Sequence, residues 1–143
     1  MVHLYHGDGK GKTTAAVGLS VRAAGAGLKV VFVQFIKARH STEIKNLEML
    51  GITVIRPQGK SKFASKMNEE ELDALKIVHD ENLEKALSLN PDLLILDEAC
   101  AALKYGCVDE GLLKSAMEYG REKEAVFTGR NPAQWMLDGA DYV

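Results

Sequence analysis

The sequence predicts an α/β fold in which a parallel sheet of about six strands is covered by helices on both faces. Short apolar runs rich in β-branched and aromatic residues alternate along the chain with longer segments of helical periodicity. These runs are nearly continuous, as expected for strands buried on both faces. A glycine-rich turn joins the first run to the first helical segment. Strands connected through helices in this way form parallel sheets with right-handed crossovers.

Each element follows from a local pattern. The six apolar runs predict strands at residues 2–5, 29–35, 52–55, 93–96, 125–128 and 140–143. Helical spacing and end signals predict helices at residues 12–26, 42–50, 69–89, 98–105 and 110–119, with a last short helix after residue 131. The expected N-caps are Ser41, Asn68, Asp109 and Asn131, and Pro132 is expected at the first position of the last helix.

Length and composition indicate one globular domain spanning residues 1–143 with an ordinary core, because 46% of the residues are hydrophobic and 27% are charged. A net charge of −2 argues against a nucleic-acid partner. No segment approaches the roughly 20 apolar residues of a membrane span, and no signal peptide precedes the first strand. We therefore expect a cytoplasmic protein without a membrane partner. Cys100 and Cys107 are expected to be two core thiols.

The glycine-rich turn has the composition of a nucleotide-binding loop. It reads Gly7-Asp8-Gly9-Lys10-Gly11-Lys12-Thr13-Thr14, and its glycines let backbone N–H groups turn toward phosphate oxygens. The following helix adds its unpaired N–H groups and the positive end of its dipole. Lys12 is expected to reach between phosphates, and the Thr13 hydroxyl to bind Mg²⁺. The sequence thus predicts a P-loop (RecA-like) fold that binds a nucleoside triphosphate, although His6 occupies the position of the usual first glycine.

Four further charged residues follow predicted strands, at the edge where ligands bind in parallel sheets. Asp97 and Glu98 are candidate Mg²⁺ ligands, while Lys37 and Arg130 are candidate phosphate contacts. Asp97 could instead cap the next helix, and the two cations could be solvated. Glu98 would orient or deprotonate water in a hydrolase. In a transferase with its own nucleophile it would contact the metal or the ribose.

Several motifs, taken in order, resemble those of the P-loop-type ATP:corrinoid adenosyltransferases, and the resemblance covers nearly the whole chain. The loop from Gly7 to Thr14 resembles the family's Gly-Asn-Gly-Lys-Gly-Lys-Thr-Thr, with Asp8 in place of asparagine. The other motifs that recur in the same order are Gln34-Phe35-Ile36-Lys37, Leu96-Asp97-Glu98, Leu103-Lys104-Tyr105-Gly106 and Thr128-Gly129-Arg130.

The resemblance implies transfer of the 5′-deoxyadenosyl group of ATP to the Co(I) of a corrinoid, cobalamin or cobyrinic acid a,c-diamide, with release of triphosphate, in adenosylcobalamin synthesis or salvage. It implies ATP as co-substrate, Mg²⁺, a reduced flavin or flavodoxin as electron donor, and a homodimer. ATP would contact Gly7, Asp8, Gly9, Lys10, Gly11, Lys12, Thr13, Thr14 and Lys37; Mg²⁺ would contact Thr13, Asp97 and Glu98; catalysis would use Lys12, Glu98 and Arg130.

One expected corrinoid contact lies in the polar loop at residues 56–67, which is expected to be a lid, a binding surface or a solvated loop. Where the family carries a phenylalanine-threonine-tryptophan cluster against the corrinoid, this chain has only Phe63. Two other functions remain open. A P-loop ATPase or small-molecule kinase would use Glu98 as its catalytic carboxylate. A non-catalytic nucleotide- or corrinoid-binding protein is favoured by Asp8, by the reduced aromatic cluster and by chain ends shorter than is usual in the family.

Overall fold

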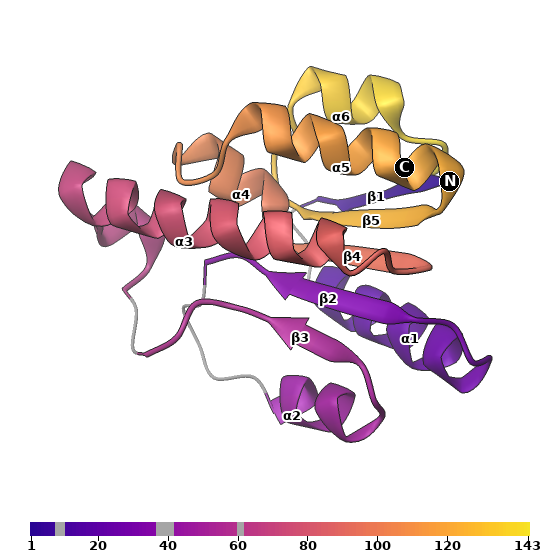
Figure 1. Ribbon diagram of the computed structural model, residues 1–143. Coiled ribbons are helices and arrows are strands. Elements are labelled where there is room, and N and C mark those ends of the chain that lie inside the picture. Colours follow the sequence, from indigo (N-terminus) through magenta and orange to yellow (C-terminus); the bar gives the residue numbers. More distant parts are fainter. Residues whose placement is uncertain (8–10, 37–41, 60–61) are drawn as a thin grey trace.

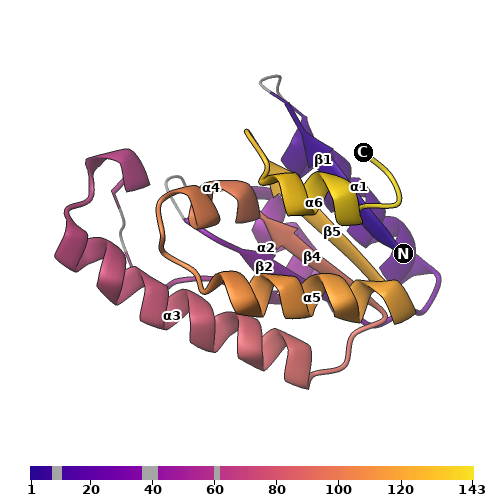
Figure 2. The same cartoon turned by 90° about the horizontal axis from the view of Figure 1, so that it is seen from above.

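The computed structural model describes residues 1–7, 11–36, 42–59 and 62–143. In these ranges α3 to α6 lie on one face of a parallel sheet, and α1 and α2 lie on the other (Figures 1 and 2). This arrangement confirms the predicted α/β fold. The elements are β1 (Val2–His6), α1 (Lys12–Gly25), β2 (Val30–Gln34), α2 (Thr42–Met49), β3 (Thr53–Ile55), the 3₁₀ turn η1 (Ala64–Lys66), α3 (Glu69–Ser88), β4 (Leu93–Asp97), α4 (Ala99–Lys104), α5 (Glu110–Glu122), β5 (Glu124–Gly129) and α6 (Gln134–Gly139).

The sheet has the strand order β1-β5-β4-β2-β3, and every neighbouring pair is parallel. The register brings the strand ends level, because His6 pairs with Gly129 and Gln34 pairs with Asp97. The glycine-rich loop, Glu98 and Arg130 therefore all follow strands that end at one edge. Strand β5 separates the strand of the loop from the strand of Asp97.

The core consists of two apolar clusters, one on each face of the sheet, and this is why the strands are apolar throughout. One cluster joins β1, β2, β4 and β5 to α3–α6 through buried residues such as Leu83, Leu113 and Met136. The other joins β2, β4 and β5 to α1 and α2 through Ala16, Ile44 and Leu47. Alternate side chains of each central strand enter opposite clusters.

The prediction of a sixth strand at residues 140–143 is wrong for the described chain, where the sheet has five strands. The segment lies beside β1, but only His3 and Tyr142 form a bridge. Backbone hydrogen bonds run from Leu4 N to Tyr142 O and from Asp141 N to Val2 O, both at 2.8 Å, whereas the Val2 N–H donates to the Asp141 carboxylate at 2.8 Å. The Val2 N–H is thus paired with a side-chain oxygen and not with a backbone carbonyl of a sixth strand.

Two predicted N-caps are confirmed. Asn68 forms a complete capping box with Glu71, and the Asp109 side chain accepts from Leu112 N. Ser41 lies outside the described residues. The predicted Asn131–Pro132 start of the last helix is wrong, because α6 begins at Gln134 after the extended Ala133. Asn131 has φ 51°, which differs from the extended backbone of an N-cap.

Both cysteines are buried and free, as expected for core thiols. None of the described helices is long and apolar enough to cross a bilayer.

Candidate functional site

The described ends of the glycine-rich loop have the geometry of a strand-to-helix turn. Gly7 and Gly11 have φ values of 128° and 109°, which L side chains rarely adopt. Lys12 Nζ donates to Gly7 O at 2.9 Å, so the ammonium group lies at the end of β1 where the loop begins. The predicted loop residues Asp8, Gly9 and Lys10 lie outside the described residues. Thr14 is exposed in the first turn of α1.

A buried carboxylate connects the loop to the other strand ends. Asp97 Oδ1 accepts from Thr13 Oγ1 at 3.0 Å and from Thr128 Oγ1 at 2.7 Å. The Thr128 hydroxyl in turn accepts from Glu98 N at 3.0 Å. Thr128 lies on β5, the neighbour of β4, so its hydroxyl joins the end of β5 to two consecutive residues at the end of β4. We call Thr13, Gln34, Asp97 and Thr128 the hydroxyl–carboxylate cluster.

Gln34 completes the cluster from β2, because it pairs with Asp97 across the sheet and its side-chain amide lowers the pKa of the Asp97 carboxyl. Burial raises the pKa of Asp97, and the hydrogen bonds from Thr128, Thr13 and Gln34 only partly oppose this rise. Glu43, in the first turn of α2, raises the pKa of Asp97 further by charge repulsion. Within the described part of the chain, Gln34 Oε1 is a buried acceptor without a hydrogen-bond partner.

Glu98 is the N-cap residue of α4 and has a left-handed backbone at φ 61°. Burial and the neighbouring Asp97 raise its pKa, whereas Lys12 and Arg130 lower it. Arg130 is exposed and, with Glu98, borders a cavity of about 280 Å³ whose other lining residues are Ala101, Lys104, Tyr105 and Asn131.

Gly129, which precedes Arg130, lies in close contact with α4. A Cβ on Gly129 would lie 2.5 Å from Cys100 Cβ, so the glycine lets α4 pack against the end of β5. Its φ of 149° also disfavours a side chain. The packing of α4 therefore depends on this position.

The oxygen donors of the cluster fit a magnesium ion better than a softer metal. Thr13 supplies a hydroxyl, and Asp97 supplies a carboxylate in contact with it. Across the described residues, no group of three or more histidine, cysteine, aspartate or glutamate side chains could form an all-protein metal cage. Mg²⁺ typically takes one or two carboxylates and completes its shell with water and phosphate oxygens. Thr13, Asp97 and Glu98 could therefore hold Mg²⁺ together with a bound polyphosphate.

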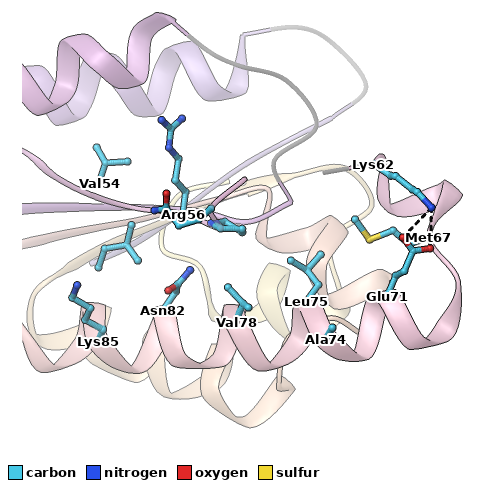
Figure 3. Close-up of a pocket in the computed structure, with 13 residues that line it drawn as sticks. Val54, Arg56, Lys62, Met67, Glu71, Ala74, Leu75, Val78, Asn82 and Lys85 are labelled. Atoms are coloured by element: carbon cyan, nitrogen blue, oxygen red, sulfur yellow. Dashed lines mark hydrogen bonds and ion pairs between the residues drawn. The ribbon is translucent and has the colours of Figure 1, made fainter. Parts of the chain in front are cut away.

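A second, larger hollow lies beside the edge strand. This groove, of about 860 Å³, is bounded by β3 with residues 56–58 on one side and by α3 on the other (Figure 3). Leu75, Val78 and Asn82 point into it from α3, whereas the Arg56 side chain leaves in the opposite direction (Figure 3). Its walls are mainly apolar, with Lys62 and Glu71 paired at 3.0 Å at one end.

The structure brings several predicted site residues to one edge: Lys12, Thr13, Asp97, Glu98 and Arg130. Lys37 lies outside the described residues. Phe63 is 47% exposed at the start of η1, where Lys66 Nζ lies 5.9 Å from its ring centroid.

Other site residues were missed by the sequence analysis: Gln34, Glu43, Lys104, Tyr105, Thr128 and Asn131. Four of them lie in motifs that carried the resemblance, and Asn131 directly follows one. Their position in these motifs was therefore the sequence signal that could have identified them as site residues. The motifs alone did not show what each side chain contacts.

The fold and the cluster define a class of protein, an α/β protein with a phosphate-loop sequence between β1 and α1 and a buried carboxylate at the end of β4. The sequence model of one family, described as "ATP:corrinoid adenosyltransferase BtuR/CobO/CobP", matches residues 1–143. The chain belongs to this family, and the resemblance seen in the sequence is confirmed.

Relatives of the chain are named corrinoid adenosyltransferases. A corrinoid adenosyltransferase of Pseudomonas aeruginosa is 31% identical over 144 residues, covering 98% of this chain and 71% of the relative. A corrinoid adenosyltransferase of Escherichia coli strain K12 is 29% identical, covering 100% and 74%. The corrinoid adenosyltransferase CobA of Salmonella typhimurium is 28% identical, again covering 100% and 74%.

Replacing Asp97 with asparagine should stabilise the ligand-free protein at neutral pH. The folded pKa of Asp97 lies above the value of 3.8 for an unperturbed carboxyl, so its ionisation opposes folding at higher pH. We expect Asp97→Asn to raise the melting temperature at pH 7 by about 2–4 °C. The gain should shrink as the pH falls through the raised folded pKa and should vanish below 3.8, where the carboxyl becomes protonated in both states.

Thermal unfolding of wild type and Asp97→Asn from pH 4 to pH 8 checks this expectation. The exposed Asp73→Asn on α3 is the matched control and should show no such pH-dependent gain. A lower melting temperature for Asp97→Asn at pH 7 would contradict the account of the cluster.

Proposed function

We propose that this chain is a single-domain enzyme that transfers the 5′-deoxyadenosyl group of ATP to the Co(I) centre of a corrinoid and releases inorganic triphosphate. The observation that carries the proposal is the Thr13–Asp97 hydrogen bond, in a chain that matches the family along its whole length. This contact joins the phosphate-loop helix to the strand of the candidate metal ligands, as binding of a metal–polyphosphate requires.

The proposed reaction is a displacement at carbon. The Co(I) electron pair forms the cobalt–carbon bond at C5′, the C5′–O bond breaks, and its electron pair leaves on the triphosphate. Because the attacking metal is itself a strong nucleophile, the protein needs no general base. Its tasks are to align C5′ with cobalt and to stabilise charge on the departing triphosphate.

The charge-stabilising groups are those at the carboxyl edge of β1, β4 and β5. Lys12 and Arg130 lower the pKa of Glu98 by their charge, Lys104 lines the same cavity as Glu98, and Lys10 and Lys37 are proposed to add further positive charge. Backbone N–H groups from Gly7 to Thr14 would surround the phosphates. Mg²⁺, held by Thr13, Asp97 and Glu98, would supply two positive charges to the leaving group.

We place the corrinoid against the groove between β3 and α3. Strand β3 lies two strands from β4, about 10 Å at ordinary strand spacing. The apolar lining, which includes Pro57, Met67, Leu75 and Val78, suits the face of a macrocycle. Asn82 and Lys85 would meet its polar side arms, and Phe63 would contact it from the neighbouring loop.

The remaining parts of the proposal follow from the family resemblance alone. The corrinoid is cobalamin or cobyrinic acid a,c-diamide, and the reaction serves adenosylcobalamin synthesis or salvage. A reduced flavin or flavodoxin supplies the electron that forms Co(I). The enzyme acts as a cytoplasmic homodimer.

Product analysis tests the reaction. The protein is incubated with ATP, Mg²⁺ and chemically reduced cobalamin, and the corrinoid and phosphate products are separated. We expect a light-sensitive cobalt–carbon product and one triphosphate for each turnover. Lys12→Ala should lower kcat by about 100-fold or more, because it removes a charge from the leaving-group site.

The same experiment separates the alternatives. ADP and phosphate as products would instead support an ATPase or kinase that uses Glu98 as its catalytic carboxylate. ATP binding without turnover, with Co(I) supplied, would support a non-catalytic binding protein.

A substitution in the groove tests where the corrinoid binds. Leu75→Ser should raise the KM for the corrinoid by about tenfold, since it removes an apolar contact, and should leave the KM for ATP unchanged. Ile77→Ser is the control, because Ile77 is on the same helix but 63% exposed and outside the groove. Equal effects of both variants on the corrinoid KM would argue against this placement.

A further inference from the structure

His79 is a buried polar side chain for which the proposed reaction has no use. It lies on α3, and only 1% of its surface is exposed. Its Nδ1 atom is 2.8 Å from Cys107 O, and its Nε2 atom is 3.2 Å from Ile36 N. The ring also packs edge-on against Phe35, with 5.0 Å between centroids. The imidazole therefore connects α3, the end of β2 and the segment between α4 and α5.

These two contacts determine the protonation of the ring. A backbone N–H can only donate, so Nε2 must be the acceptor for Ile36 N. A carbonyl can only accept, so Nδ1 carries the proton that is donated to Cys107 O. Burial lowers the pKa of His79, which agrees with a neutral ring.

Ile36 is the reason why this bond matters. It has φ 50°, a left-handed backbone that is unfavourable for a β-branched residue. The preceding Phe35 N donates to Asp97 O at 2.9 Å. The chain thus leaves β2 through a strained turn fixed by one hydrogen bond to β4 and the next to His79.

We infer that His79 is a positioning residue for the nucleotide site, because its imidazole holds the left-handed turn at Ile36 and so fixes the end of β2. Two residues earlier Gln34 pairs with Asp97 across the sheet, and in the sequence Lys37 directly follows Ile36. His79 also belongs to the helix that forms one wall of the groove. It therefore links the groove wall to the edge of the sheet that binds phosphate. The inference rests on the proposed function only in taking ATP as the ligand.

Two amide variants separate positioning from packing. Glutamine in His79→Gln can place its oxygen near the Nε2 position and accept from Ile36 N. Asparagine in His79→Asn can place its nitrogen near the Nδ1 position and donate to Cys107 O, but it does not reach Ile36. Titration calorimetry with Mg²⁺-ATP, without corrinoid, measures affinity, and thermal unfolding measures stability.

We expect His79→Asn to weaken ATP binding by about three- to tenfold, the effect of one hydrogen bond, and His79→Gln to bind nearly as wild type. Equal ATP affinities of the two variants, or affinities that simply follow their melting temperatures, would overturn the inference. Failure of the wild type to bind ATP would instead overturn the proposed function and this inference with it.

The wild-type protein provides a second test that needs no variant. Nitrogen NMR of labelled histidine should show the His79 proton on Nδ1 and an accepting Nε2, with Ile36 N–H protected from exchange. A proton on Nε2, or rapid exchange at Ile36, would overturn the inference even if the variants did not fold.

Discussion

The buried Asp97 carboxylate is the constraint on which the site depends. Its charge is unfavourable in this environment, and it is retained among donors from three other elements: Thr13 on α1, Gln34 on β2 and Thr128 on β5. Each donor reduces the energetic penalty of burial without removing it, since the pKa of Asp97 stays raised. A carboxylate held in this state is well suited to a cation, which would relieve both its desolvation and its repulsion from Glu43 and Glu98.

The edge of the sheet and the groove beside β3 differ in polarity, and this difference matches the two substrates of the proposed reaction. The edge near β1, β4 and β5 combines charges and hydroxyl groups, suited to a polyphosphate, whereas the groove near β3 is mainly apolar, suited to a macrocycle. Because all strands are parallel, β1, β3, β4 and β5 have their carboxyl ends at the same edge of the sheet. In the proposed complex, the ribose C5′ would lie between the polyphosphate and the corrinoid and could meet the metal-centred nucleophile. Helix α3 contributes to both the groove and the edge, through its groove wall and through His79.

Much of this was predictable from the sequence because it is encoded locally. The apolar strands, the glycine-rich loop and the caps at Asn68 and Asp109 are short patterns with one structural solution. The hydrogen bonds of Thr128 to Asp97 and Glu98 could not be predicted in this way, since they depend on β5 lying beside β4 in the sheet. The last strand was wrongly predicted because Asp141 contributes its side chain where the apolar pattern indicated a backbone ladder.

The central claim is that the pocket holds the polyphosphate as the group to be expelled. A crystal structure with Mg²⁺ and a slowly hydrolysed ATP analogue tests this most directly. We expect the triphosphate in the cradle between Gly7 and Thr14, with Mg²⁺ near Thr13 and Asp97 and the ribose C5′ open toward the groove. A terminal phosphorus facing the groove, with C5′ buried against the protein, would contradict the account.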